Sequence, residues 1–376
     1  MAIKKELKLK DISQKGSLET NIVTQPEIGA IVGIDLGDKR SSYCSLDARG
    51  GDLGEGVVAT TAEALRMVFA GKGKMRIAIE CGTHSPWVSR LLQRLGHEVI
   101  VANPRRLRLI AESNRKNDKA DARTLATVAQ AAPSLLKQVH HRSERVQLDL
   151  ATIKARDTAV QARSRMVAAI RGIVKSTGGR LTVCSTGAFA KKAFESCPTI
   201  LRDALTPLMR IIAELTAEIR QYDRVIECKM KSEYAQAVPI LTIPGVGSLT
   251  ALTFVLLLDN DPNRFSKSRD LGCYFGLQPK QQDSGKFVSQ LGITKAGDQL
   301  MRKLAVQCSH FMLGRFGRDS ALRRWGLALC LRGGSNAKKR AVVAVARKLL
   351  ILMHHLWKTQ TAFVPFPGAQ SVPQAA

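Results

Sequence analysis

The sequence lacks the cysteine spacing that structural zinc sites need. Eight cysteines occur among 376 residues, and no two of them form a Cys-x-x-Cys pair. We therefore expect no zinc finger or zinc ribbon, and free thiols in a reducing compartment are the simplest interpretation. This favours a cytoplasmic protein.

Long apolar runs and aromatic residues are also scarce. The longest apolar runs, such as residues 252–258, are too short to span a bilayer. Residues 1–29 are polar and mixed in charge, so we expect no signal peptide and interpret them as a flexible arm. Aromatic residues make up 5% of the chain, which argues against a membrane-surface role that depends on Trp or Phe anchors.

Acidic residues are few compared with basic ones. Asp and Glu number 31 against 58 Lys and Arg, which gives a net charge of +27 spread over the whole chain. Such an excess favours a polyanionic partner, and nucleic acid is the first candidate. We therefore expect a nucleoid-associated, DNA- and RNA-binding protein.

Against this basic background, two acids stand at the ends of apolar runs. Asp35 lies in the run 30–37, and Glu80 ends the run 75–80. Short β-branched runs of this kind are typical of buried strands in an α/β sheet. A carboxylate buried there is costly unless it is paired or bound to a metal ion.

Two further acids share one predicted helix. Asp118 and Asp121 are three positions apart, so their side chains point to the same helical face and repel each other. The compensating cation is either a neighbouring side chain, such as Lys119 or Arg123, or a divalent metal ion. A solvated acidic patch at a helix start is the alternative for this pair taken alone. With Asp35 and Glu80, the pair predicts a cluster of four acids built from two strands and one helix.

The order of elements predicts an α/β domain over residues 30–135. Strands are expected near 30–36, 41–47, 55–60, 75–80 and 98–102, with helices alternating after the third strand. A hairpin-like start followed by alternating α and β favours a ribonuclease H-like fold. In that fold the first and fourth strands are neighbours, and the helix of Asp118 and Asp121 packs across them.

Cations surround the predicted acidic helix. Arg105, Arg106, Arg115 and Lys116 precede it. They form either a rim that grips phosphates or a solvated charged face, and the sequence leaves both open.

Residues 136–236 are expected to form a long helical hairpin or coiled coil. A Pro-free stretch over 141–176 and apolar residues at three- and four-residue steps over 201–226 predict its two helices. Their role could be that of a spacer, a dimer contact or an RNA-binding arm. Residues 181–198 form an insert between the helices without an assigned role.

Residues 237–360 predict a mainly helical distal domain. Gly245 and Gly247 lie in a stretch typical of a helix-hairpin-helix turn, where backbone amides and a helix N-terminus can approach a phosphate. Glycines and Pro279 indicate loop between short elements over residues 265–298, and further helices are expected near 300–304 and 336–359. Residues 361–376 are expected to be a disordered tail.

Together these motifs resemble the insertion-sequence transposases with an Asp-Glu-Asp-Asp catalytic set. Those enzymes are relatives of the Piv-type DNA invertases and are also known as bridge-RNA-guided recombinases. The resemblance covers most of residues 30–355 and rests on a proximal set of acids and a distal block of motifs. The motifs are Gly33-Ile34-Asp35, Glu80, Asp118-Lys119-Ala120-Asp121-Ala122, Ile243-Pro244-Gly245-Val246-Gly247, Gly276-Leu277-Gln278-Pro279, Ser284-Gly285-Lys286 and Gly292-Ile293-Thr294-Lys295-Ala296-Gly297.

The resemblance implies a RuvC-like first domain and a transposase domain that follows it. Asp35, Glu80, Asp118 and Asp121 would be catalytic ligands of Mg²⁺ or Mn²⁺, and Ser284 would be the strand-transfer nucleophile. It further implies donor and target DNA, a non-coding guide RNA and a homo-oligomer, dimer or tetramer, as partners. Lys286 and Lys295 would join the residues that bind nucleic acid.

Two other functions fit parts of the sequence. A stand-alone Holliday-junction-type endonuclease would use the same acids and leave Ser284 without a role. A non-catalytic nucleic-acid-binding protein would have no use for the four acids. Tyr274 is a rival nucleophile, although its apolar neighbours favour a place in the core.

Overall fold

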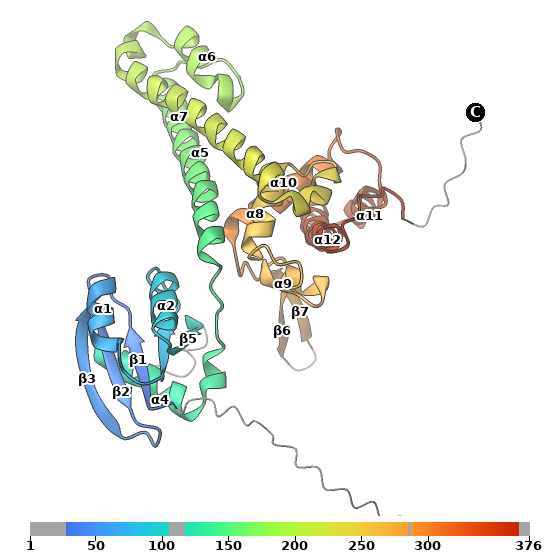
Figure 1. Ribbon diagram of the computed structural model, residues 1–376. Helices are drawn as coiled ribbons and strands as arrows, with labels where there is room; N and C mark the ends of the chain where they lie inside the picture. The colour runs from blue at the N-terminus through green and yellow to red at the C-terminus, as the bar shows by residue number, and fades with distance from the viewer. Residues whose placement is uncertain (1–27, 105–116, 285–286, 368–376) are drawn as a thin grey trace, which may run out of the picture. The chain divides into compact units, whose positions relative to one another are not determined.

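A computed structural model of the chain describes residues 28–104, 117–284 and 287–367. The chain divides into two compact units, Met1–His141 and Arg142–Ala376 (Figure 1). The predicted arm 1–29 and tail 361–376 lie largely outside the described residues. The predicted boundaries within each unit stay predictions.

Unit 1 is built on one five-stranded sheet. Its strands are β1 (Ala30–Asp35), β2 (Arg40–Leu46), β3 (Asp52–Ala59), β4 (Met75–Glu80) and β5 (Glu98–Ala102). Their order across the sheet is β3-β2-β1-β4-β5. The first three strands are antiparallel, whereas β1, β4 and β5 are parallel. The predicted α/β character and the neighbouring first and fourth strands are confirmed.

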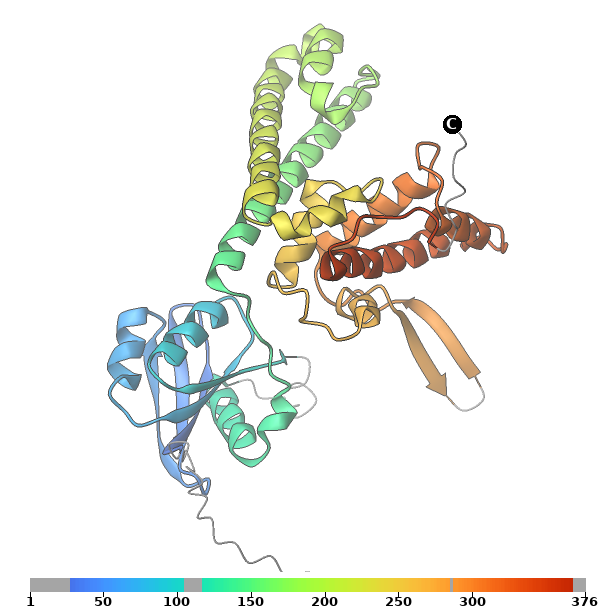
Figure 2. The same ribbon diagram turned by 45° about the vertical axis from the view of Figure 1, so that its right-hand side comes forward.

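The two faces of this sheet are covered by different helices (Figure 2). One face buries an apolar cluster that includes Val32 and Ile34 with residues of α1 (Ala62–Phe69) and α2 (Ser85–Arg94). The other face carries α4 (Asp118–Ala131), whose Leu125 and Ala129 pack with Ile31 and Ala78. A short 3₁₀ helix, Pro133–Leu136, follows α4.

Gly33 allows α4 to lie unusually close to the sheet. A Cβ atom at this position would collide with the backbone oxygen of Ala122 and the backbone nitrogen of Ala126, and would come within 2.9 Å of the Leu125 Cβ. Any side chain at residue 33 would therefore push the helix away from β1. The closeness of α4 to the central strand depends on this single glycine.

Unit 2 begins with the predicted helical hairpin. Its arms are α5 (Glu144–Ser176) and α7 (Thr199–Ser232), which lie side by side in both views (Figures 1 and 2). The insert that sequence left unassigned forms a 3₁₀ turn, Thr186–Ala188, and α6 (Phe189–Ser196). Phe189 and Ala193 of α6 pack on Ile170, Val174 and residues of α7, so the insert closes the end of the hairpin.

The other end of the hairpin shares a core with the distal helices. Val146 and Leu150 of α5 and Met230 of α7 belong to the same buried cluster as Phe254 and Trp357. The elements of this distal part are the 3₁₀ helices η3 (Ala235–Thr242) and η4 (Ser268–Asp270) and the helices α8 (Ser248–Leu257), α9 (Leu271–Tyr274), α10 (Gln299–Leu313), α11 (Ala321–Cys330) and α12 (Ala337–Thr359).

The expectation that residues 279–293 are mostly loop is wrong. They form β6 (Pro279–Ser284) and β7 (Phe287–Ile293), an antiparallel pair with Gln281 opposite Gln290 and Ser284 opposite Phe287. Pro279 opens the first strand, a position where its missing N–H interrupts no interior pairing. Among the described residues, no helix is both long and apolar enough to cross a membrane.

Candidate active site at the sheet edge

Asp35 and Glu80 lie side by side at the carboxyl edge of the sheet. The parallel register pairs Ile34 with Ile79, so the next residues along the two strands are Asp35 and Glu80. Side chains alternate along a strand, and Ile31 and Ala78 face α4. Asp35 and Glu80 therefore share that face, and both are half-buried.

The first turn of α4 reaches the same edge. Ile31 packs with Leu125 and Ala129, while the Gly33 position faces Ala122 and Ala126. An advance of two residues along β1 thus corresponds to about one helical turn toward the start of α4. By this trend Asp35 lies level with the first turn, which carries the exposed Asp118 and the half-buried Asp121.

The helix begins here because Asn117 caps it. The Asn117 side chain accepts a hydrogen bond from the Lys119 N–H at 3.1 Å, and residues of this type are preferred at the start of a helix. Acids in the first turn interact favourably with the helix dipole. The start of α4 therefore tolerates Asp118 and Asp121 despite their mutual repulsion.

The two side-chain cations proposed to compensate these acids have other partners. Lys119 Nζ lies 2.9 Å from Glu55 Oε1, and Arg123 pairs with Asp52 on the same strand, β3. The Arg123 guanidinium also holds the pKa of Asp52 below its usual value. Within the described ranges, no ion pair involves Asp118 or Asp121. The sequence left open whether a side-chain cation or a metal ion compensates these acids, and the two side-chain candidates that it named are paired with β3.

We call Asp35, Glu80, Asp118 and Asp121 the acidic edge. In the part of the chain that the structure describes, no three His, Cys, Asp or Glu side chains stand close enough together to hold a metal ion. The elements bring the four acids to one region, and reorientation of their side chains would be needed to complete a site. Carboxylate oxygens are the donors that Mg²⁺ and Mn²⁺ prefer, so the donor type fits.

A thiol beside the acidic edge is poorly suited to join a metal site. Burial raises the pKa of Cys81, a hydrogen bond with Ser85 lowers it, and the neighbouring Glu80 charge raises it again, with a net upward shift. Because metals bind the thiolate and not the thiol, Cys81 is a weak ligand candidate. The donors that the acidic edge itself offers are carboxylate oxygens.

The predicted nucleophile lies in unit 2. Ser284 is the last residue of β6 and stands opposite Phe287, the first residue of β7. Its backbone is described and its side chain is not, so the role of its hydroxyl stays a prediction. In both views the β6–β7 hairpin projects from the helices of its unit (Figures 1 and 2).

The rival nucleophile Tyr274 is engaged in packing. Its hydroxyl donates a hydrogen bond to the backbone oxygen of Leu257 at 3.2 Å. Its ring lies 5.1 Å from that of Phe265 and 5.0 Å from that of Phe275, measured between centroids. These contacts support a structural role for Tyr274.

The predicted nucleic-acid contacts have mixed outcomes. Arg105, Arg106, Arg115, Lys116 and Lys286 lie outside the described residues. The exposed Lys295 adopts a left-handed backbone conformation, φ 55°, and its N–H bonds the Gly276 oxygen at 3.1 Å. Its role in binding stays a prediction.

The two glycines of the predicted helix-hairpin-helix turn differ. Gly245 has φ 89°, and a Cβ atom there would lie 2.5 Å from the Phe311 ring, so its space is used for packing. Gly247 precedes α8 with open space where a Cβ would lie. The element before the turn is the 3₁₀ helix η3, which contains Pro239, rather than an α-helix. Of the two residues, Gly247 is the better candidate for a phosphate contact.

Sequence reasoning missed Asp52 and Glu55 on β3. Asp52 lies before the predicted strand 55–60, and an ion pair between a helix and an edge strand leaves no periodic signal in the sequence. An edge strand carrying two acids is a natural partner for cations on a helix packed beside it.

Comparison with known proteins covers both units. Residues 32–178 match a family of DEDD-type IS110 proteins described as "Transposase", and residues 238–324 match the "Transposase IS116/IS110/IS902 family". A transposase for insertion sequence element IS1111A from Coxiella burnetii is 30% identical over 331 residues, 85% of this chain and 86% of the relative.

Two further relatives extend this picture. A transposase for insertion sequence element IS1328 from Yersinia enterocolitica is 30% identical over 278 residues, 73% of this chain and 80% of the relative. A pilin gene-inverting protein from Moraxella lacunata is 27% identical over 153 residues, 40% of this chain and 45% of the relative.

Proposed function

The chain belongs to the IS116/IS110/IS902 family of insertion-sequence transposases, and on that premise we propose that it cuts and joins DNA with the acidic edge and Ser284. The observation that carries the proposal is the β1–β4 register, which sets Asp35 beside Glu80 on the face that α4 covers. The pairing of Lys119 and Arg123 with β3 supports it, because these cations are then not spent on Asp118 and Asp121.

In this proposal the acidic edge holds Mg²⁺ or Mn²⁺. When bound, the ion would stabilise negative charge on a scissile phosphate. Asp35 and Glu80 would contribute oxygens from rigid strands, and Asp118 and Asp121 from the helix start. Because β1 and β4 are central and buried, the first pair is positioned more firmly than the second.

Ser284 would act as the nucleophile. Its oxygen would form a bond to phosphorus as the strand's own oxygen leaves, which retains the energy of the phosphodiester in a covalent intermediate. Attack by the strand end on this intermediate would rejoin DNA and release the serine. The two sites lie in different units, and the proposed homo-oligomer would allow them to meet between subunits.

A non-coding guide RNA is proposed as the source of target choice. The net charge of +27 supports binding of a polyanion, although it does not distinguish RNA from DNA. Duplex binding should weaken with salt at a slope of about −0.9 for each phosphate neutralised. Sequencing of RNA that copurifies with the protein tests guidance directly, and a random mixture of cellular RNA would contradict it.

The chemistry is tested with a matched set of variants on a labelled DNA substrate. Ser284→Ala should abolish the covalent protein–DNA adduct, whereas Ser289→Ala, on the opposite strand of the same hairpin, should retain it. Asp121→Ala should abolish cleavage and leave DNA binding largely intact. An adduct formed by Ser284→Ala would place the nucleophile elsewhere. Cleavage by Asp121→Ala would remove that acid from the catalytic set.

A further inference from the structure

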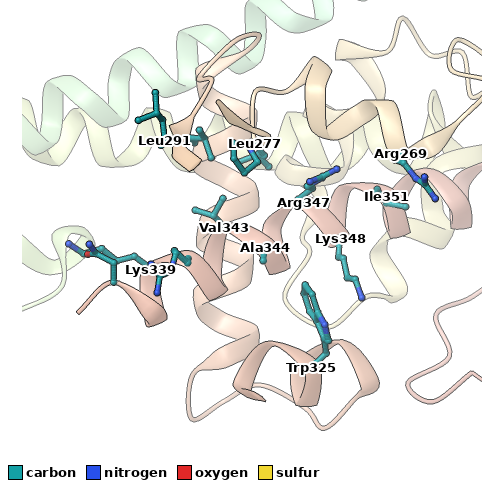
Figure 3. A pocket seen from close by; sticks show the side chains of 15 residues that line it. Arg269, Leu277, Leu291, Trp325, Lys339, Val343, Ala344, Arg347, Lys348 and Ile351 are labelled. Atoms are coloured by element: carbon teal, nitrogen blue, oxygen red, sulfur yellow. The ribbon is translucent and has the colours of Figure 1, made fainter. Parts of the chain in front are cut away.

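Unit 2 contains a cavity that the proposed chemistry does not use. Its volume is about 850 Å³, within the usual range for small-molecule sites. One wall is α12, another is Trp325 of α11, and a third is the start of β6 and the end of β7 (Figure 3). The residues at the hairpin wall are Pro279, Leu291, Gly292 and Ile293.

One face of α12 is dedicated to this cavity. The lining positions recur at steps of three and four, which defines a single helical face, and they alternate between cationic and apolar side chains. They are Lys339, Arg340, Val343, Ala344, Arg347, Lys348 and Ile351. The opposite face of the helix, with Val345, Leu349 and Met353, is buried in the core of the unit.

The charge of the cavity has one sign. Five cations line it, namely Arg269, Lys339, Arg340, Arg347 and Lys348. Among the described residues that line the cavity there is no carboxylate. Lys339, Arg340 and Lys348 are exposed, so their charges are available to a ligand that enters from solvent. An anion fits this site, and a cation does not.

The half-buried Trp325 gives the cavity an aromatic wall. The neighbouring Gly326 lets α11 approach the core, since a Cβ there would lie 2.6 Å from Val345 and 2.7 Å from Leu313. Lys348 extends from α12 toward the indole, with its Nζ 3.8 Å from the ring centroid (Figure 3). The ring is therefore held between two packed helices with a cation over one face.

Arg347 is also positioned by a glycine. A Cβ at Gly272 of α9 would lie 2.7 Å from the Arg347 Nε and 3.1 Å from its Cγ. The absence of a side chain at residue 272 leaves a channel along which Arg347 lies. A cation supported in this way loses less conformational entropy on binding an anion than a fully solvated lysine does.

We propose that this cavity binds an unpaired nucleotide of a single-stranded DNA segment. Its base would stack on Trp325 above the apolar side chains of Leu277, Val343 and Ile351, and its flanking phosphates would contact the cations. The bases of an intact duplex are stacked on each other, so they cannot stack on Trp325. DNA is chosen because it is the substrate of transposases, so the inference rests on the DNA-handling part of the proposed function and not on Ser284.

Lys348 would change partners when the base enters. Its exposed ammonium contributes a modest cation–π contact, which is weaker than the stacking of a base on an aromatic ring. A base can therefore replace the ammonium on the indole. The long, exposed side chain of Lys348 can then turn to a neighbouring phosphate, so the exchange retains both interactions.

The test compares two aromatic–cation pairs of unit 2 in the full-length protein. Trp325→Ala removes the proposed stacking wall. Phe316→Ala is the matched control, because Phe316 carries Arg315 at 4.6 Å in the same unit and does not line the cavity. Affinities are measured by fluorescence anisotropy for labelled oligothymidylate, for oligouridylate RNA of the same length, and for duplex DNA of the same length.

Trp325→Ala should weaken binding of oligothymidylate by about 5- to 100-fold, and Trp325→Phe should restore most of it. Phe316→Ala should change the affinity for oligothymidylate by less than about twofold, because Phe316 does not stack on the bound base. Trp325→Ala should change the affinity for duplex DNA by less than about twofold, because duplex bases do not stack on Trp325. Equal losses for the two alanine variants, or an equal loss on duplex, would overturn the proposal. If the protein bound RNA more tightly than DNA, and Trp325→Ala weakened the binding of RNA alone, the occupant of the cavity would be RNA and not DNA.

A second variant keeps the test decisive if Trp325→Ala fails to fold. Lys348→Gln alters an exposed side chain and should leave the thermal unfolding temperature unchanged. It should make the negative slope of log affinity against log salt shallower by about 0.7 for oligothymidylate, because one phosphate contact is lost. An unchanged slope would contradict the phosphate contact. Adduct formation by Ser284 is scored separately, so its failure would not be mistaken for failure of this site.

Discussion

Two groups of carboxylates in this molecule differ in their pairing with neighbouring cations. Asp149, on α5 in unit 2, is 7% exposed and is fully engaged: Lys229 Nζ lies 2.8 Å from Oδ1, and the Tyr234 hydroxyl donates to Oδ2. In the acidic edge of unit 1, the cations nearest in sequence to Asp118 and Asp121 pair with β3 instead. The first arrangement stabilises the fold, and the second keeps Lys119 and Arg123 away from ion pairs with Asp118 and Asp121.

The titration behaviour of the Asp149 group reflects this engagement. Burial pushes the pKa of Asp149 up, but hydrogen bonds from Lys229 and Tyr234 outweigh it and hold that pKa below its usual value. Burial, followed by the hydrogen bond to Asp149, raises the pKa of Tyr234. Glu233 extends the group by accepting from Lys229 at 3.0 Å and from Arg145 at 3.1 Å. Both oxygens of Asp149 and both oxygens of Glu233 therefore have a partner within the fold.

The largest effect is expected from Gly33→Ala, which disrupts the close packing of α4 on the sheet. The new methyl group would meet the backbone of Ala122 and Ala126, so the helix must shift or unit 1 must lose stability. Such overpacking costs about 1–3 kcal/mol, or more when backbone must move. DNA cleavage should be lost as the acids of α4 leave the edge.

The control for this change is Gly73→Ala in the same unit, where a Cβ would meet no atom within 4 Å. Urea denaturation measures the free energy of unfolding of both variants, and a cleavage assay measures activity. Normal activity and stability in Gly33→Ala would show that the edge does not depend on this contact.

A smaller effect is expected from Tyr234→Phe, which tests the structural role of the Asp149 group. It removes a hydrogen bond to a buried carboxylate, worth about 1.5–3 kcal/mol of unfolding free energy. Tyr222→Phe, at a half-buried position on α7, the helix that precedes Tyr234, should cost less than about 0.5 kcal/mol. DNA cleavage should survive in both variants under conditions where they remain folded. Loss of cleavage in a folded Tyr234→Phe protein would refute a purely structural role.

The pH dependence of stability should carry the smallest and most specific signal. Because the folded pKa of Asp149 is lowered, its contribution is complete above the usual value of 3.8 and is lost as pH falls through the lower folded pKa. Because the pKa of Tyr234 is raised, its contribution is complete below the usual value of 10.0 and declines as pH rises above it.

Unfolding free energies measured across pH for the wild type and Asp149→Asn isolate the acid limb. The difference between the two proteins should be constant from about pH 5 to 9 and should shrink below pH 3.8. A difference that grows on acidification would mean that the carboxylate is destabilised in the folded state.

Much of unit 1 could be predicted from the sequence, because buried parallel strands are near-continuous apolar runs with clear ends. The strands at 75–80 and 98–102 agree with the structure at both ends, and so does the start of the first strand. The neighbouring positions of Asp35 and Glu80 followed from that order. The partners of Lys119 and Arg123 did not, because ion pairs between a helix and an edge strand leave no periodic signal.

Unit 2 was harder to predict where local signals conflict with packing. The β6–β7 hairpin is rich in polar residues, including Gln281, Gln282 and Gln290, and it lacks the alternation of a half-buried sheet. α6 lies in a short stretch whose helix forms by packing against the ends of α5 and α7. The cavity at Trp325 joins segments distant in sequence, so only its α12 face could have been found from periodicity.

The most direct test of the central claim is binding of Mn²⁺ by the DNA-bound protein, measured by titration calorimetry or electron paramagnetic resonance. The account predicts that Asp35→Asn on β1 and Asp121→Asn on α4 each weaken the same binding event strongly. Asp38→Asn, in the exposed loop after β1, should leave it unchanged. Mn²⁺ binding that is equally strong in the wild type and in both edge variants would contradict a metal site at the acidic edge.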